Sequence, residues 1–310
     1  SRGLGDVYKR QGLSELLRRG QVNGVELEEI TAKEAREIEP RVKTVERALF
    51  SPTTSSVDPV EILSALEQDA QAAGIRLLHN TAYQGRSSGG VKTSQGTFQA
   101  GYVINTAGLY ADRIARDFGF SEDYAILPFK GLYLYSNEPV ASVRTNIYPV
   151  PDLEHPFLGV HFTIAVNGRI KIGPTATPAF WREHYKGLEN FRLDEFIEVV
   201  TRQSGLFLRN DFNFRGLAFK EVQKYFRPKM VAMAAKMLDG VHSEQYTQWG
   251  RPGIRAQLID IKRRKLEMDF RYEGDSRSFH VLNAVSPAFT CAMPFTRYLM
   301  DEIEGHLRAR

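Results

Sequence analysis

Two histidines of this chain lie in segments whose apolar spacing is typical of β-strands. His161 stands in the string Val160-His161-Phe162-Thr163, and His280 lies in a strand predicted over residues 279–282. An imidazole titrates close to neutral pH, so either side chain could act as a general base. Alternatively, each ring could do no more than satisfy hydrogen bonds inside a sheet. His161 is our first candidate for a base and His280 our second.

Four other side chains could bind an anionic ligand. The preferred two, Arg255 and Lys130, lie close to glycines, where the backbone leaves room for a ligand. An arginine offers a planar bidentate fork, and a lysine offers a mobile point charge. Tyr148 and Arg182 are second candidates. For Arg255 and Lys130 the alternative is an ion pair at the surface or between domains, which contributes little stability.

The composition is that of an ordinary globular protein. The 310 residues are 42% hydrophobic and 25% charged, and 41 basic against 37 acidic residues leave a net charge of +4. These values exclude a disordered tail, a collagen-like fibre and a disulfide-rich scaffold, and the basic excess is too mild to indicate nucleic-acid binding. The single cysteine, Cys291, can form neither an internal disulfide nor a multi-cysteine metal site. We therefore expect a reducing compartment and no metal.

Several known motifs are missing from the sequence. It has no P-loop, no His-Glu-x-x-His, no Gly-x-Ser-x-Gly and no Cys-x-x-Cys. It shows no secretory signal pattern, and its longest apolar stretch, near 230–235, is too short to span a bilayer. The basic run 262–265 could contact nucleic acid or lipid, but no aromatic residues flank it for base stacking. A solvated hairpin is the favoured interpretation of that run.

A mixture of helices and strands must position these side chains. Thr31-Ala32-Lys33-Glu34 is a capping box that opens a short helix, and Asp58 followed by Pro59 opens a longer one. Strands are expected over 75–78 and 97–105, with a turn at 87–90 between them. The longer helix should bury one apolar face, made of Ile62, Leu63, Leu66 and Ala70.

The strand 97–105 runs into the small residues Thr106-Ala107-Gly108 and a helix over 110–118. Small residues between a strand and a helix let the backbone approach a phosphate, although ordinary turns also need them. Between 128 and 173, short strands rich in Tyr, Phe, Val and Ile predict an antiparallel sheet. The remaining elements are, in order, helices over 193–203 and 219–238, the strand 279–282, the loop 283–287 and a helix over 288–303.

Longer strings resemble one family of flavoenzymes. They include Val103-Ile104-Asn105-Thr106-Ala107-Gly108, Tyr148-Pro149-Val150-Pro151-Asp152, Val160-His161-Phe162-Thr163, Gly253-Ile254-Arg255-Ala256-Gln257 and His280-Val281-Leu282-Asn283-Ala284-Val285-Ser286-Pro287-Ala288. From about Gly12 to its end, the chain resembles the FAD-dependent L-2-hydroxyglutarate oxidase/dehydrogenase family, within the D-amino-acid-oxidase-like flavoenzymes. The second and third strings are specific to that family, whereas Asn-Thr-Ala-Gly occurs across the superfamily.

The resemblance implies oxidation of the secondary alcohol of L-2-hydroxyglutarate to 2-oxoglutarate, with FAD accepting the hydride. It implies that His161, or otherwise His280, is the general base. It also implies that the substrate is bound by Arg255, Lys130, Tyr148 and Arg182. Ala107 and Gly108 should lie beside the ADP half of FAD. Free N–H groups at the start of the last helix should face the isoalloxazine. The cofactor-binding residues implied there are Ser286, Pro287, Ala288 and Thr290, of which Pro287 contributes no N–H. The alternatives are a related flavoenzyme acting on another 2-hydroxy acid or an amine, and a non-enzymatic basic binding module.

The start of the chain departs from the family. Residues 1–11 read as a translated sequencing adapter, and the Gly-x-Gly-x-x-Gly turn of the first βαβ unit is not present. We therefore expect a truncated enzyme that binds FAD poorly and is inactive as it stands.

The predicted fold is α/β with α+β character. It combines a partial Rossmann-like FAD-binding domain, lacking its first βαβ unit, with an antiparallel-sheet substrate domain. We assign 12–45 and 131–253 to the substrate domain, and 46–130 and 254–310 to the FAD-binding domain. The expected partners are a small dicarboxylate and an electron acceptor (oxygen, a quinone or a flavoprotein), without nucleic acid. The expected location is cytoplasmic, and peripheral contact at the inner membrane face stays open.

Overall fold

The computed structural model describes residues 2–151, 159–284 and 288–308. They form two compact units, each built from three stretches of chain. Unit 1 comprises Ser1–Gly74, Gly131–Thr177 and Ala218–Pro252, and unit 2 comprises Ile75–Lys130, Pro178–Leu217 and Gly253–Arg310. Compared with the domains assigned from sequence, residues 46–74 fall in unit 1 and residues 178–217 in unit 2.

The main sheet of unit 1 is antiparallel, which confirms the prediction for the segment 128–173. Its strands follow the order β12 (Tyr246–Trp249), β8 (Leu134–Ser136), β10 (Ile170–Gly173) and β9 (His161–Ile164). Leu134, Phe162 and Ile172 point to one face and are fully buried, in a core shared with Met230 of α7 (Arg227–Ala234). Each such side chain contributes about 2 kcal/mol through burial. This face fixes the register of the sheet and leaves the opposite face to the alternate side chains.

The remaining elements of unit 1 begin where their caps predict. The antiparallel strands β1 (Glu28–Thr31) and β2 (Arg47–Phe50) flank α2 (Ala32–Ile38), and α1 (Arg2–Val22) precedes them. The Thr31 hydroxyl accepts from the Glu34 N–H at 3.2 Å, and the Glu34 carboxylate accepts from the Thr31 N–H at 2.7 Å. Asp58 accepts from the Val60 N–H at 2.8 Å and caps α3 (Pro59–Ala72). Both predicted helix starts are confirmed.

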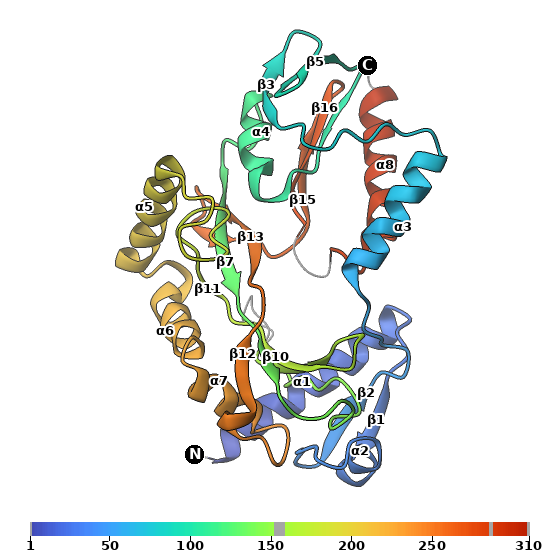
Figure 1. Ribbon diagram of the computed structural model, residues 1–310, viewed down its shortest axis with the longest axis vertical. Helices are drawn as coiled ribbons and strands as arrows, with labels where there is room; N and C mark the ends of the chain where they lie inside the picture. Colours follow the sequence, from blue (N-terminus) through green and yellow to red (C-terminus); the bar gives the residue numbers. More distant parts are fainter. Residues whose placement is uncertain (1, 152–158, 285–287, 309–310) are drawn as a thin grey trace. The chain divides into compact units, whose positions relative to one another are not determined.

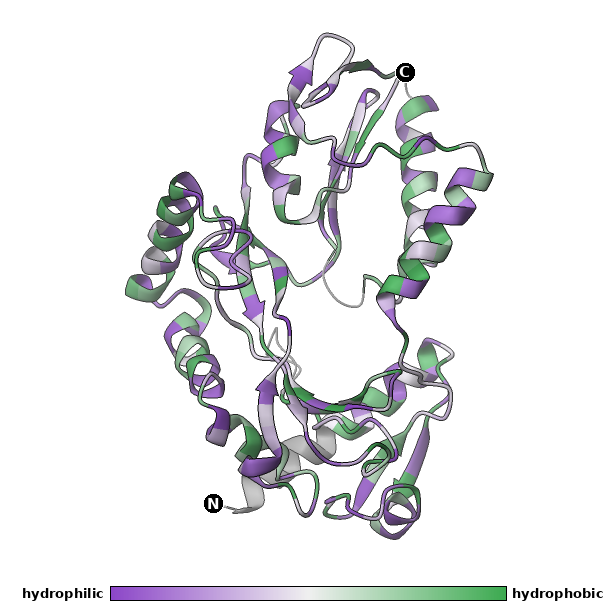
Figure 2. Ribbon diagram, viewed as in Figure 1, coloured by the Kyte–Doolittle hydropathy of each residue, from purple (hydrophilic) through white to green (hydrophobic). Residues whose placement is uncertain are grey.

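The predicted burial of one α3 face is wrong. Ile62 is only half-buried, Leu63 is 56% exposed, Leu66 is 36% exposed, and no residue of α3 is buried. Figure 2 shows the apolar residues of this helix interspersed with hydrophilic ones. The apolar spacing predicts the helix, but it does not reveal whether a neighbouring element covers the apolar face of that helix.

Unit 2 contains a three-stranded sheet between two helices. β16 (Ser278–Asn283) pairs in parallel with β6 (Val103–Asn105) and antiparallel with β15 (Arg271–Gly274). Leu282 packs against α4 (Ala111–Asp117), while Phe279 and Val281 pack against α8 (Ala292–Arg308). Side chains alternate along β16, so each helix covers one face of the sheet (Figure 1).

Unit 2 also contains a second sheet with a basic hairpin. β7 (Tyr124–Gly131) and β13 (Gly253–Asp260) belong to it, and β14 (Lys265–Leu266) returns antiparallel to β13. The run 262–265 lies at this turn, where Lys262 forms an ion pair with Asp123 at 2.8 Å. It is an exposed hairpin, as predicted.

The remaining elements are assigned to unit 2, to both units or to unit 1. They are the antiparallel strands β3 (Tyr83–Ser87), β4 (Gly90–Thr93) and β5 (Gly96–Gln99), the short helices η1 (Gly108–Tyr110) and η2 (Asp211–Asn213), and α5 (Leu193–Arg209). α6 (Phe214–Lys224) begins in unit 2 and ends in unit 1, β11 (Thr177–Pro178) lies where the chain passes from unit 1 to unit 2, and η3 (Ser243–Gln245) belongs to unit 1.

Three predicted elements differ in the structure. Residues 75–78 form no strand, and Ile75, Leu77 and Leu78 are 57%, 39% and 44% exposed. The predicted strand 97–105 is two strands, β5 and β6, which belong to different sheets. The predicted helix 219–238 is interrupted before α7, because Pro228 has no N–H and fits only a first helical turn.

Candidate functional site

His161 is held at the start of β9 in unit 1. Its side chain is almost fully buried, and its Nδ1–H donates to the carbonyl of Gly159 at 3.0 Å. A carbonyl can only accept, so the neutral ring carries its proton on Nδ1 and presents Nε2 as the basic nitrogen. Burial lowers the pKa of His161, the hydrogen bond that His161 donates to the Gly159 carbonyl partly opposes this, and the charge of Lys171 lowers the pKa further. The imidazole is therefore neutral at pH 7 and able to accept a proton.

Tyr148 lies directly against His161. The two rings stack with centroids 4.4 Å apart and planes 27° apart, and Tyr148 is half exposed. A bridge between Ile147 and Phe162 brings the tyrosine to this position. Tyr148 and His161, both predicted site residues, are thus neighbours in unit 1.

The polar face of the unit 1 sheet extends beyond His161. In the register of β9 and β10, His161 lies opposite Gly173, and Lys171 lies two residues along β10 on the same face. A Cβ on Gly173 would meet the Leu132 carbonyl at 2.7 Å and the Tyr133 ring at 2.8 Å. Only glycine leaves room there for the Tyr133 ring, over which the Lys171 ammonium lies at 4.8 Å from the centroid.

Sequence reasoning missed Lys171 and Tyr133. Lys171 stands between the buried Ile170 and Ile172, so the alternation of the strand already indicated that its side chain faces away from the core. Its proximity to His161 depends on cross-strand register, which the local pattern does not reveal.

Lys130 and Arg255 lie on two strands of one sheet in unit 2. Lys130 is near the end of β7 and Arg255 is within β13, and burial lowers the pKa of both cations. The Arg255 Nε donates to the Gln257 side chain at 3.1 Å. Burial and the charge of Lys130 also lower the pKa of His184 to about 4. Partly buried cations of this kind are suited to binding anionic groups.

Arg182 has a carboxylate partner inside unit 2. Its guanidinium is fully buried and donates to both oxygens of Asp112, at 2.6 Å and 3.0 Å. The Tyr110 ring lies 5.7 Å away, and Glu198 lies at 3.6 Å. This interior ion pair accounts for Arg182 without a substrate.

His280 is also an interior residue. It is fully buried on β16 between Phe118 and Phe120, whose ring centroids are 5.1 Å and 5.0 Å from its own. Its Nδ1 accepts from the Asn105 amide at 3.1 Å, and its Nε2–H donates to the Ser278 hydroxyl at 3.0 Å. Burial lowers the pKa of His280 to about 4, although Asp275 opposes the shift. Both ring nitrogens are engaged within unit 2, so the geometry favours His161 over His280 as a base.

The turn after β6 has room for a cofactor. The Asn105 side chain accepts from the Ala107 N–H at 3.1 Å and donates to the Ala111 carbonyl at 2.8 Å, which fixes the turn. Gly108 has φ +55°, and a Cβ built there would meet no atom within 4 Å. A left-handed glycine beside open space fits the close approach of a nucleotide cofactor to the backbone.

The loop before α8 is only partly described. Ser286 and Pro287 lie outside the described residues, and Ala288 and Thr290 lie in a turn. The last helix begins at Ala292 instead of 288, because residues 288–291 turn before it and the Phe289 carbonyl accepts from the Ala292 N–H at 3.3 Å. The predicted start of this helix is therefore wrong by four residues.

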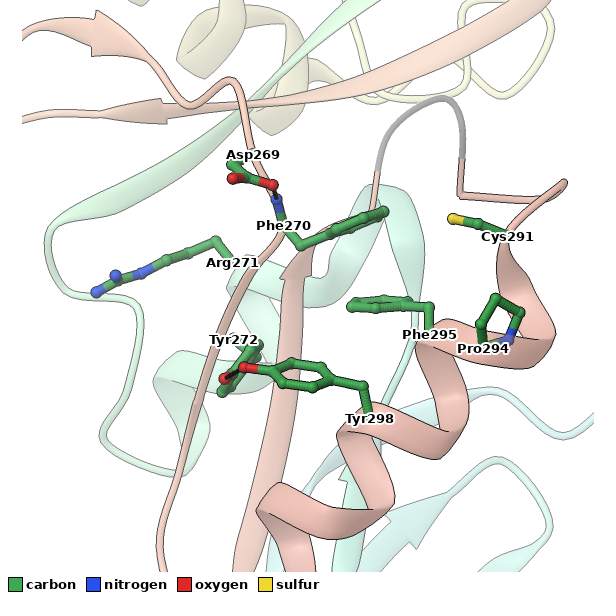
Figure 3. Close-up of a pocket in the computed structure, with 8 residues that line it drawn as sticks. All are labelled: Asp269, Phe270, Arg271, Tyr272, Cys291, Pro294, Phe295 and Tyr298. Carbon is green, nitrogen blue, oxygen red and sulfur yellow. Dashed lines mark hydrogen bonds between the residues drawn. The ribbon is translucent and has the colours of Figure 1, made fainter. Parts of the chain in front are cut away.

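A cavity of about 660 Å³ opens between α8 and the segment that leads into β15. Figure 3 shows Phe270 stacked against Phe295, with centroids 4.0 Å apart, and the Cys291 sulfur nearby. Tyr272 and Tyr298 share a hydrogen bond at 2.5 Å. The cavity is thus largely aromatic, and none of the predicted site residues lines it.

Residues 2–151, 159–284 and 288–308 contain no group of three or more metal-ligating side chains. In the same part of the chain, no helix has the length and apolar character needed to cross a bilayer.

Sequence comparisons agree on one type of enzyme. A family model described as FAD dependent oxidoreductase matches residues 2–299. Mitochondrial L-2-hydroxyglutarate dehydrogenase of Mus musculus is 33% identical over 96% of this chain and 68% of its own length. The human protein of that name is 33% identical over 94% and 67%, and the L-2-hydroxyglutarate dehydrogenase of Escherichia coli K12 is 28% identical over 95% and 70%.

Solved structures of flavoenzymes share the fold. L-alpha-glycerophosphate oxidase from Mycoplasma pneumoniae, with FAD bound, superposes with a TM-score of 0.65 at 18% identity, covering 96% of this chain and 70% of its own. Glycine oxidase from Bacillus cereus gives a TM-score of 0.61 at 15% identity, covering 96% and 69%. At such identities the likeness concerns the fold alone, and it agrees with the predicted α/β class.

Proposed function

Because the chain belongs to the FAD-dependent oxidoreductase family, we propose that it oxidises L-2-hydroxyglutarate to 2-oxoglutarate. The substrate is supported by relatives named L-2-hydroxyglutarate dehydrogenase that match 94–96% of the chain. The observation that carries the chemistry is the hydrogen bond from His161 Nδ1 to Gly159, which leaves Nε2 as a basic nitrogen on a polar face.

In the proposed reaction, His161 Nε2 accepts the proton of the substrate hydroxyl. The hydroxyl O–H bond and the C–H bond of the secondary carbon break as the C=O bond forms, so a proton leaves the oxygen for His161 and a hydride leaves the carbon. FAD, when bound, takes the hydride. A histidine with a lowered pKa stays neutral at physiological pH and is ready for this role.

We assign the substrate carboxylates to Arg255 and Lys130, with Tyr148 contacting substrate beside His161. Arginine can hold a carboxylate through two parallel hydrogen bonds, and lysine adds a point charge. Both cations are partly buried, where Coulomb attraction is stronger than in bulk water. Arg182 is left out of this set because Asp112 already occupies its guanidinium.

We assign the ADP half of FAD to the turn at Ala107 and Gly108, where the open space above the glycine admits a ligand. The isoalloxazine is assigned to the loop before α8, from Ser286 to Thr290. We expect the reduced enzyme to be reoxidised by oxygen, a quinone or another flavoprotein. Reoxidation rates measured with each of the three identify the electron acceptor.

Turnover of a substrate panel tests the proposed function. With the first βαβ unit of the family fused to the chain, the FAD-loaded protein should lose its yellow colour when mixed anaerobically with L-2-hydroxyglutarate, and 2-oxoglutarate should form in equal amount. The D-enantiomer, other 2-hydroxy acids and amino acids are the controls. Faster reduction by an amine or by another hydroxy acid would refute the assigned substrate.

A further inference from the structure

The polar face of the unit 1 sheet, which carries His161, also carries a cation that the predicted site does not include. Lys171 is half-buried, and the cross-strand register places it diagonally from His161. On the neighbouring strand it lies opposite Tyr135 of β8, whose ring is covered by Arg169 at 4.4 Å from the centroid. The face therefore combines an imidazole, tyrosine rings and two basic side chains.

The surroundings of the Lys171 ammonium are aromatic. It lies over the face of the Tyr133 ring, and within the described residues no carboxylate is within ion-pair distance of it. Burial is the cause that lowers the pKa of Lys171, without an opposing contribution from an acid. Charged groups that leave water in proteins are normally paired, so a half-buried ammonium with no acid beside it among the described residues points to an anion that binds there.

The position of this cation is built into the sheet. Gly173 has no side chain, and the Tyr133 ring fills the space that a Cβ would need. The ring in turn supports the lysine ammonium beside His161. Tyr148 stacks on the imidazole. A small anionic molecule bound to Lys171 would thus lie next to the basic nitrogen of the proposed reaction.

We propose that Lys171 is a substrate-binding residue, whose ammonium binds one carboxylate of a dicarboxylic hydroxy acid on this face, beside His161. The inference rests on the proposed function for the identity of the substrate.

Ligand binding without turnover gives the first test. Glutarate and 2-oxoglutarate are titrated into the purified protein by calorimetry, which requires no flavin reduction. Replacing lysine by methionine keeps the length of the side chain and removes its charge. Lys171→Met should weaken dicarboxylate binding about 10- to 100-fold, the size of one hydrogen bond to a charged group. Lys171→Arg should restore most of the affinity.

A matched control separates a local contact from loss of overall charge. Lys33, an exposed lysine of α2 in the same unit, is replaced by methionine in the control variant. Lys33→Met should bind glutarate like the wild type, and circular dichroism should show that all variants are folded. If Lys171→Met binds glutarate within about twofold of the wild type, or if the wild type binds no dicarboxylate, the inference is wrong.

Steady-state kinetics of the FAD-loaded protein, with the first βαβ unit of the family fused to the chain, distinguish this inference from the proposed function. Lys171→Met should raise KM for L-2-hydroxyglutarate by a similar factor while kcat changes less, because the contact is made in both the ground state and the transition state. If the wild type binds glutarate through Lys171 but does not oxidise L-2-hydroxyglutarate, the proposed function is wrong and the binding residue stands. If L-2-hydroxyglutarate is oxidised with the same KM after the substitution, the function stands and the role of Lys171 is refuted.

Discussion

Replacing Arg182 with methionine should destabilise unit 2 by about 3–5 kcal/mol, because it leaves the buried carboxylate of Asp112 without its partner. Both side chains are fully buried, and the guanidinium donates to both carboxylate oxygens, at 2.6 Å and 3.0 Å. After the substitution, Asp112 keeps only the Ile126 N–H at 3.1 Å and Arg116 at 3.4 Å. Neither replaces a bidentate charge partner.

The unfolding free energy lost in Arg182→Met should depend on pH, and the ion pair determines the direction of that dependence. In the wild type, burial pushes the pKa of Asp112 up, but the hydrogen bonds and charge of Arg182 outweigh it and hold the pKa below its usual range. Without Arg182, burial dominates and the pKa rises above that of the unfolded chain. Protonation then removes the uncompensated charge, so the deficit of Arg182→Met should shrink as the pH falls through the raised pKa.

Urea unfolding measures this effect through the fluorescence of Trp181, which is 3% exposed and adjacent to the substituted residue. The other tryptophan, Trp249, is replaced by phenylalanine in every variant. The double variant Arg182→Met/Asp112→Asn should recover most of the loss, because no unpaired charge stays buried. As a control, Arg308→Met removes an exposed pair with Glu304 in α8 and should cost at most about 1 kcal/mol.

A carboxylate-binding role for Arg182 makes the opposite prediction. The variant would then unfold like the wild type and raise KM for L-2-hydroxyglutarate. An unfolding free energy within about 0.5 kcal/mol of the wild type would refute the interior ion pair as the reason for this residue.

Three further predictions concern the site and its support. With the first βαβ unit of the family fused to the chain, His161→Ala should lower kcat by about 10²–10⁴-fold in anaerobic flavin reduction, the usual size of a lost general base, and a normal kcat would exclude that role. Arg255→Ala should mainly raise KM for L-2-hydroxyglutarate in the same assay, and a fall in kcat at unchanged KM would contradict uniform carboxylate binding. Burial lowers the pKa of His280 from 6.5 to about 4, so the unfolded chain takes up its proton first as the pH falls. The unfolding free energy of unit 2 should therefore drop by about 3 kcal/mol between these pH values, and a His280→Gln variant should lose that dependence.

Features set by neighbouring residues could be predicted from the sequence. The capping box at Thr31 and the cap at Asp58 need only residues two or three positions away, so the helix starts were predicted correctly. The antiparallel sheet of unit 1 follows from a two-residue alternation that buries one set of side chains. The family resemblance predicted the type of enzyme, because the matching sequence segments occur in the order of the family along most of the chain.

Tertiary structure decided which side chains meet and which are covered. The predicted strand 97–105 divides between two sheets, because β6 pairs with β16, a strand far along the chain. The ion pair of Arg182 with Asp112 joins residues 70 positions apart, so only the folded chain reveals it. The local sequence does not predict a binding role for Lys171, because it is one polar residue in an alternating strand. Its proximity to His161 arises from the hydrogen-bond register between β9 and β10, and that register depends on the whole buried face of the sheet.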